Sequence, residues 1–301
     1  MSGAVDDRLL AEVSRSFALS IRLLPGPMRW PVGVAYLLAR ASDTLADTAT
    51  VPAARRIALL DGFAGEIAGE GGDWRDAGLG DFRDRQEHPG ERRLIERLDG
   101  CFAALESLPE PQRAIVREVV DVILSGQKLD LQRFAEGPGV LASDAELSDY
   151  CWRVAGCVGR FWTRIGFATL GNRFSGESPE QLEERGIRYG KGLQLVNILR
   201  DLPGDLANGR CYLPVADPSD REALLVEAAG WRDQARRWLG DGERYASALT
   251  SRRLRAASVL PALIGERTLS KLDGADWETL EAGVKVSRGV VRRCLLRALF
   301  W

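Results

Sequence analysis

The chain has 301 residues, 45% hydrophobic and 28% charged, which is the balance of a globular protein with one large domain or two small ones. Its 41 basic and 43 acidic residues leave a formal net charge of −2, which argues against nucleic acid as a partner. The single histidine, His88, lies in a polar stretch that we expect at the surface, which argues against a Ser-His-Asp mechanism.

Helical spacing of apolar residues dominates the sequence, and strand-like alternation is scarce. The pattern predicts a first helix over residues 8–20 and a second helix that begins at Pro31 as its first residue. A third is predicted over 53–69. Residues 70–91 are rich in glycine, aspartate and arginine, which indicates a surface loop or short helices.

Later segments with helical spacing are separated by proline and glycine, with breaks predicted near Gly240 and Asp273. These predicted helices cover residues 92–108, 112–134, 144–171, 179–202, 220–239, 242–272 and 277–300. Nothing resembles a domain linker or an internal repeat. The sequence therefore predicts a single all-α domain over residues 1–301, built by helix packing.

The termini and the cysteines bear on location. The N-terminal stretch is acidic and has no apolar core, so we expect no signal peptide, and no run approaches the ~20 apolar residues of a membrane span. The C-terminal segment VVRRCLLRALFW is either a packed last helix or a helix on a membrane surface. Five scattered cysteines without a C-x-x-C pair indicate reduced thiols. We expect a cytoplasmic protein whose membrane contact is peripheral, and the oligomeric state is not indicated.

The segment from Tyr36 to Asp47 carries the first candidate site. At about 100° per residue, Tyr36, Arg40, Asp43 and Asp47 fall on one face of a helix. The intervening residues are apolar around nearly the whole circumference, so we expect this helix to be largely buried. Charged groups on such a helix need a strong reason, because burying charge without a partner is expensive.

The segment from Gln194 to Asp205 repeats the arrangement. Gln194, Asn197, Asp201 and Asp205 share one face if the helix continues, again among apolar neighbours. Pro203 is expected to end or kink the helix between the two aspartates, so that Asp205 reaches the site from a turn.

Carboxylates four residues apart suit a hard cation such as Mg²⁺, which prefers oxygen ligands and retains water or phosphate oxygens. Two such helices could hold several ions that neutralise a diphosphate, with arginines on the remaining phosphate oxygens. A lone acidic pair is more simply a solvated face or an ion pair. Two pairs, each with a polar partner on an apolar helix, favour a metal–diphosphate site.

At these residues the sequence resembles the squalene/phytoene synthase family of head-to-head prenyl transferases. Four motifs in order carry the resemblance: Ser14 to Phe17, Arg40 to Asp47, Asp149 to Gly159, and Gln194 through Pro214. The resemblance implies an all-α class I isoprenoid synthase bundle with a central apolar cavity. Lys128 departs from the apolar residue that is usual there, so no role is assigned to residues 126–130.

The resemblance also implies roles for individual residues. Magnesium would be bound by Asp43, Asp47, Asn197, Asp201 and Asp205. The substrate diphosphates would be contacted by Arg15, Ser16, Arg40, Arg200 and Arg210. The pocket would be shaped by Phe17, Tyr36 and Gln194. Tyr150 would assist the first half-reaction; its alternative is a buried core tyrosine with a hydrogen-bonded hydroxyl.

The implied reaction joins two prenyl diphosphates, with farnesyl diphosphate expected, through presqualene diphosphate. Thr44 follows Asp43 where many relatives have a second aspartate, which resembles reductive squalene synthases and implies NADPH as hydride donor. Dehydrosqualene, phytoene or presqualene diphosphate synthesis without NADPH are alternatives. Non-enzymatic assembly factors of the family have lost metal-binding aspartates, and head-to-tail elongases carry more acidic motifs, so both fit less well.

Overall fold

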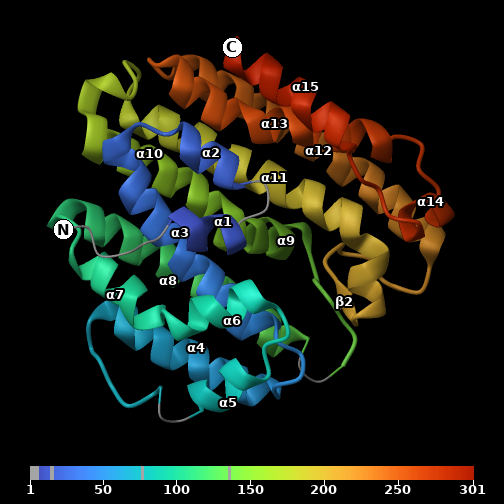
Figure 1. The fold of residues 1–301 in the computed structure, drawn as a ribbon. Coiled ribbons are helices and arrows are strands. Elements are labelled where there is room, and N and C mark those ends of the chain that lie inside the picture. Colours follow the sequence, from blue (N-terminus) through green and yellow to red (C-terminus); the bar gives the residue numbers. More distant parts are fainter. Residues whose placement is uncertain (1–6, 14–16, 76–77, 135–136) are drawn as a thin grey trace. The chain divides into compact units, whose positions relative to one another are not determined.

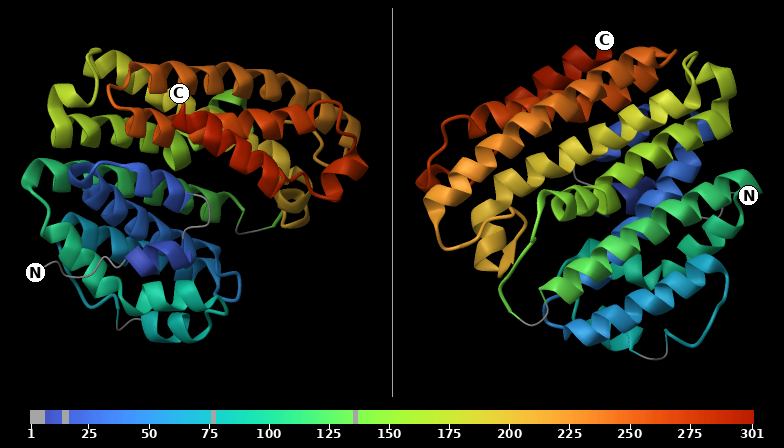
Figure 2. Two further views of the ribbon diagram at one scale, coloured as in Figure 1. Left: turned by 45° about the horizontal axis from the view of Figure 1, so that its top comes forward. Right: turned by 180° about the vertical axis from the view of Figure 1, so that it is seen from behind.

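The computed structural model describes residues 7–13, 17–75, 78–134 and 137–301 (Figures 1 and 2). Nearly all of these residues that lie in regular structure are helical. The chain forms two compact units, Met1–Ala135 with Ala168–Leu170, and Glu136–Phe167 with Gly171–Trp301. A single domain over residues 1–301 stays a prediction, as does a central apolar cavity.

The first unit is built around one long helix, α3, which packs against α4, α6, α7 and α8. Figure 1 shows these helices in blue to green. The helices of this unit are α1 Asp7–Val13, α2 Phe17–Leu23, α3 Gly26–Asp47, α4 Ala53–Ala68, α5 Leu79–Asp84, α6 Pro89–Glu96, α7 Leu98–Glu106 and α8 Glu110–Arg133.

The start of α3 differs from the prediction that its first residue is Pro31. The helix begins at Gly26, and Pro31 lies inside it, where its missing N–H forgoes one helical hydrogen bond. Burial of Met28 favours the added turn. Arg29 also ties this turn to the preceding segment, because its guanidinium donates to the carbonyl oxygens of Arg22 and Leu24 at 3.0 and 3.1 Å. Tertiary packing therefore outweighs the local preference of proline for a helix start.

The second unit stacks α11, α12, α13 and α15 in succession, each helix packing on the one before it (Figures 1 and 2). Its elements are β1 Gly139–Val140, α9 Asp144–Cys151, a π-helical turn Trp152–Gly156, α10 Cys157–Leu170, a 3₁₀ turn Gly171–Arg173, α11 Pro179–Ala207, β2 Arg210–Cys211, α12 Arg221–Ala248, α13 Arg252–Leu272, α14 Trp277–Glu281 and α15 Arg288–Leu299.

Four further predicted helix boundaries differ from those of the structure. α11 continues through Pro203 to Ala207 instead of ending between the two aspartates. α12 continues through Gly240, and the chain breaks after Ala248, where Ser251 caps α13 by accepting from the N–H of Leu254. A glycine in a helix interior costs only about 1 kcal/mol, which the packing of α12 on its neighbours outweighs. The predicted helices over 92–108 and 277–300 are each divided in two.

Backbone contact between α11 and the segment that precedes it depends on glycine. A Cβ on Gly159 would lie 1.8 Å from the carbonyl oxygen of Gly186, and a Cβ on Gly190 would lie 2.2 Å from that of Ala155. Only residues without a side chain allow this approach.

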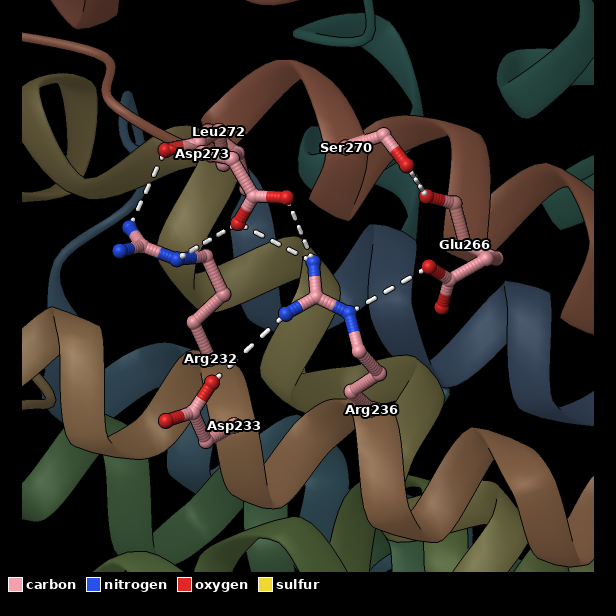
Figure 3. Close-up of polar contacts among 7 residues, drawn as sticks. All are labelled: Arg232, Asp233, Arg236, Glu266, Ser270, Leu272 and Asp273. Carbon is pink, nitrogen blue, oxygen red and sulfur yellow. Dashed lines mark hydrogen bonds and ion pairs between the residues drawn. The ribbon is translucent and has the colours of Figure 1, made fainter.

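An ion network joins α12 to the end of α13 (Figure 3). Arg236 contacts Asp273 at 2.8 and 3.1 Å and Glu266 at 3.3 Å, and Arg232 contacts Asp273 at 3.2 Å and the Leu272 carbonyl at 3.1 Å. Single exposed ion pairs contribute little to stability, whereas several charges that form a network can contribute more.

Two short parallel strands link the segments around α9 and α11. Gly139 pairs with Arg210, and Val140 pairs with Cys211. The chain that leaves α11 therefore runs beside the chain that enters α9. Within the described ranges, no helix is both long and apolar enough to span a membrane.

Candidate active site

The polar residues expected on one face of α3 lie on a helix whose other residues are mostly buried, as predicted. Tyr36, Arg40 and Asp43 are half-buried and Asp47 is exposed. The Tyr36 hydroxyl donates to the carbonyl oxygen of Val13 at 3.4 Å, which ties the helix to α1. The residue after Asp43, Thr44, points away from this face: it is buried, and its hydroxyl donates to the carbonyl oxygen of Arg40 at 3.0 Å.

Arg40 lies between two carboxylates. Its Nη2 is 2.5 Å from Oε1 of Glu91 in α6, and its Nη1 is 3.9 Å from Oδ2 of Asp43. Glu91 was not foreseen, because nothing in its exposed-looking, charged stretch distinguishes it from a surface glutamate. The pairing holds the guanidinium beside Asp43.

Gln127 in α8 contacts Asp43 directly. Its Nε2 donates to Oδ1 of Asp43 at 2.5 Å, and the side chain is buried. Its Oε1 is buried and accepts no hydrogen bond from any residue that the structure describes. The neighbouring Lys128, the residue that departs from the family pattern, turns aside to pair with Asp61 at 2.9 Å. Gln127 therefore belongs to the polar cluster around Asp43, to which the sequence pattern assigned only residues of α3.

The protonation of Asp43 is strongly perturbed. Although 44% of its side chain is accessible, desolvation by the surrounding protein raises its pKa to about 7. The negative charge of Asp47 raises the pKa further, and that of Glu91 adds to it, whereas Arg40 and the Gln127 amide lower it. A carboxyl that ionises near neutral pH beside a second carboxylate is a place where a cation is electrostatically favoured.

The oxygen atoms of α3 and α8 fit Mg²⁺ as a ligand set. Asp43 and Asp47 offer carboxylate oxygens, and the buried Oε1 of Gln127 can accept from a metal-bound water. Among the described residues no three acidic, histidine or cysteine side chains gather closely enough to hold a metal by themselves. Mg²⁺ in proteins usually keeps several waters beside one or two carboxylates.

The face of α11 carries the second acidic pair. Because the helix continues through Pro203, Asp201 and Asp205 lie about 40° apart around its axis. Asp205 therefore lies within the helix, and the prediction that it reaches the site from a turn is wrong. Arg200 donates two hydrogen bonds to the carboxylate of Asp201, at 2.8 Å from Nε and 2.5 Å from Nη2. This pairing raises the pKa of Arg200. One turn earlier, Asn197 Nδ2 lies 3.5 Å from Gln194 Oε1.

Tyr150 is the last but one residue of α9, two positions before the π-helical turn begins at Trp152. Its ring is buried and stacks on Tyr212, with centroids 4.7 Å apart and planes 21° apart. The pairing of β1 with β2 places Tyr212 beside α9, because Cys211 accepts at its carbonyl from Leu141 N–H at 3.0 Å. Tyr212 lies in the tail of the second aspartate motif, but its pairing with Tyr150 could not be foreseen. π turns occur frequently at functional sites.

Some predicted residues cannot be placed. Arg15 and Ser16 lie outside the described residues, and Phe17 is the first residue of α2, with no description of its side chain. Arg210 is half-buried on β2. The α3 aspartates belong to the first unit, whereas Tyr150 and the α11 aspartates belong to the second. Their convergence on one diphosphate stays a prediction.

The fold and the sequence of the chain are both similar to those of known proteins. The solved structure of squalene synthase HpnC from Alicyclobacillus acidocaldarius matches with a TM-score of 0.63 and 22% identity, and covers 89% of this chain and 91% of that chain. The fold is thus the all-α helical fold of isoprenoid synthases. Residues 10–290 match the sequence profile described as Squalene/phytoene synthase. The chain belongs to this family.

Two curated relatives show the breadth of the family. Squalene synthase of Bos taurus is 30% identical over 208 residues, which are 69% of this chain and 45% of that protein. The 15-cis-phytoene synthase of Synechocystis is 28% identical over 265 residues, 80% of this chain and 68% of that protein. The chain spans less than half the length of the bovine relative. Family members are prenyltransferases, and they include squalene and phytoene synthases.

Proposed function

We propose that the protein joins two molecules of farnesyl diphosphate head to head through presqualene diphosphate, and converts this intermediate to squalene with NADPH as hydride donor. The observation that carries the proposal is the polar cluster on α3. There Asp43, with a pKa of about 7, lies beside Asp47 and is held by Gln127 and Arg40 on an otherwise apolar helix. The family match over residues 10–290 supports the same reading.

In this proposal, Mg²⁺ is held by Asp43 and Asp47 on α3 and by Asp201, Asp205 and Asn197 on α11. When bound, magnesium supplies positive charge that stabilises the diphosphate as its C–O bond breaks. Gln127 fixes the direction in which Asp43 presents its second oxygen. The buried Oε1 of Gln127 accepts no hydrogen bond from the described residues and would be available to a metal-bound water.

The arginines bind the remaining phosphate oxygens. Arg40 and Arg200 each use part of their guanidinium on a carboxylate, and their other N–H groups remain as donors for a diphosphate. Arg15, Ser16 and Arg210 complete these contacts in the proposal. Phe17, Tyr36 and Gln194 shape the pocket for the first prenyl chain.

Tyr150 acts in the first half-reaction. After the C–O bond of the first substrate breaks, its C1 bonds to the double bond of the second, and loss of a proton closes the cyclopropane ring. We assign Tyr150 the role of positioning that proton or stabilising the cation. Its stacking on Tyr212 limits the directions available to the phenol.

A second candidate is a phytoene or dehydrosqualene synthase, which needs no NADPH. The match to the Synechocystis phytoene synthase, which covers 80% of this chain, favours it. Thr44 favours squalene through its likeness to reductive members, but its buried side chain lies away from the aspartates. No residue of this chain is assigned to NADPH, so the product decides between the two candidates.

The proposal places the enzyme in the cytoplasm with peripheral contact to a membrane, because a C30 hydrocarbon does not accumulate in water. The test is product analysis by mass spectrometry after incubation of the purified protein with Mg²⁺ and farnesyl diphosphate, with and without NADPH. Squalene formed only with NADPH is the expected result. A dehydro product in both reactions, or turnover of geranylgeranyl diphosphate to phytoene, would instead support the second candidate.

A further inference from the structure

The last described helix, α15, exposes a face that is both basic and apolar. Its inner side is set by Cys294 and Ala298, which are buried where α15 packs against α13. At about 100° per residue, Arg292 and Leu296 lie nearly opposite these two residues. We define the outer face of α15 as the exposed residues of this opposite side, Arg288, Arg292, Arg293, Leu296, Leu299 and Phe300.

The apolar part of this face is unusual for this protein. Leu296, Leu299 and Phe300 are 58%, 42% and 79% exposed, and among the described residues Val226 is the one other large apolar side chain with comparable exposure. The three cluster in the last turn of the helix and directly after it. Large apolar side chains gathered at one end of a surface helix mark an interaction site.

The charge of this segment is also distinct. Residues 282–301 contain Lys285 and four arginines and no acidic residue, whereas the whole chain has a net charge of −2. Arg288, Arg292 and Arg293 form no ion pair with another residue in the described part of the chain. Their positive charge is therefore available to an external partner.

A basic groove borders the same helix. It has a volume of about 540 Å³ and is lined by Arg267, Arg293 and Arg297, together with Glu243 and Glu266 and further residues of α13 and α15. Glu266 pairs with Arg236 outside the groove at 3.3 Å, so it offsets less of the positive charge of the arginines that line the groove (Figure 3). The groove offers guanidinium groups that suit a phosphate.

We propose that the outer face of α15 docks the protein onto an anionic lipid bilayer, with Leu296, Leu299 and Phe300 in the headgroup–acyl boundary and the arginines on lipid phosphates. A bilayer supplies both the apolar depth and the negative charge that this face complements. A second copy joined through the same face would bring like charges together. The inference deepens the proposed function, since a membrane-bound enzyme delivers a hydrocarbon product directly to lipid.

The test is co-sedimentation of the purified full chain with vesicles of phosphatidylglycerol and phosphatidylcholine, compared with phosphatidylcholine alone. We expect binding to the anionic vesicles that weakens as salt is raised. Arg288→Gln with Arg292→Gln should weaken binding about tenfold or more, since each arginine near an anionic surface contributes roughly fivefold. Leu296→Ser with Phe300→Ser should weaken it at least as much.

The matched control is Val226→Ser with Arg237→Gln on α12, which removes one exposed apolar and one exposed basic side chain elsewhere and should bind like the wild type. Circular dichroism melting confirms that each variant is folded. No binding of the wild type, equal binding to neutral vesicles, or wild-type binding by the outer-face variants overturns the proposal. So does a wild-type dimer that these variants dissociate. Vesicle binding needs no substrate, so inactivity toward farnesyl diphosphate would count against the proposed function alone.

Discussion

The amide nitrogen of Gln127 donates a 2.5 Å hydrogen bond to Oδ1 of Asp43, although the two residues are 84 positions apart in sequence. This contact connects α8 to the acidic face of α3. A hydrogen bond to a metal-binding carboxylate holds it in one orientation and stabilises its charged form. Gln127 is thereby expected to act through Asp43 and not by itself.

Replacing Gln127 with alanine should lower kcat/KM for farnesyl diphosphate roughly 10- to 100-fold and raise the magnesium concentration needed for half-maximal rate. The pH profile should also move to higher pH, because the pKa of Asp43 loses a contact that lowers it. Lys128→Ala is the matched control, because Lys128 pairs with Asp61. This variant should leave kcat/KM, the magnesium requirement and the pH profile unchanged. Equal kinetics in the two variants would show that Gln127 only fills space.

Magnesium binding should strengthen as pH rises through about 7, because Asp43, the proposed ligand, would bind only when ionised, and burial raises its pKa to about 7. Isothermal titration of the wild type with Mg²⁺ at pH 6 and pH 8 measures the change. Asp43→Asn should remove the pH dependence together with most of the affinity. An affinity that is the same at both pH values would contradict the role of Asp43.

The same shift affects stability in the absence of metal. In the folded protein the pKa of Asp43 lies above its ordinary value of 3.8. The contribution of Asp43 to the free energy of unfolding is therefore fully present below pH 3.8 and is lost as pH rises through about 7. In Asp43→Asn this loss should be absent. Thermal melts across this pH range compare the wild type with Asp43→Asn. If the melting temperatures of the two proteins depend on pH in the same way, the raised pKa of Asp43 is refuted.

Sequence pattern predicted what depends on periodicity and missed what depends on packing. The buried helix with Arg40, Asp43 and Asp47 on one face follows from the spacing of apolar residues, and the structure confirms it. Pro31 and Pro203 were expected at helix boundaries, but both lie inside helices, because local preference is weaker than burial of the flanking turns.

Residues brought in from other helices were also beyond the sequence pattern. Gln127 and Glu91 look like ordinary polar side chains of α8 and α6, and only the packing of these helices on α3 places them beside Asp43 and Arg40. Tyr212 lies within the motif from Gln194 through Pro214, but its contact with Tyr150 depends on the pairing of β1 with β2. Pairings between distant segments leave no periodic signal.

Tyr212→Leu should lower the rate of presqualene diphosphate formation, because Tyr150 loses the ring that orients it. The loss should be about 2- to 13-fold, which corresponds to the roughly 0.5–1.5 kcal/mol of a stacked aromatic pair. Tyr212→Phe keeps the ring and should retain nearly the full rate. The measurement is a single-turnover assay of the intermediate, and equal rates for Leu and Phe would exclude a positioning role for the ring.

Replacing either of two glycines of α11 with alanine should change the stability of the fold, in opposite directions. Gly190→Ala should destabilise the fold by about 3 kcal/mol or more, because the new Cβ would lie 2.2 Å from the Ala155 carbonyl oxygen. Gly204→Ala meets nothing within 4 Å and should stabilise the helix by about 0.5–1 kcal/mol. Chemical denaturation measures both; a stable Gly190→Ala variant would contradict the close backbone contact.

The central claim is that both aspartate pairs hold the magnesium that ionises a prenyl diphosphate. Its most direct test is the release of diphosphate from farnesyl diphosphate, measured for the wild type, Asp43→Asn and Asp201→Asn with and without Mg²⁺. We predict release by the wild type only with Mg²⁺, and none above background by either variant, while their thermal unfolding shows that both remain folded. Wild-type release rates in either variant, or release that does not depend on Mg²⁺, would contradict the claim.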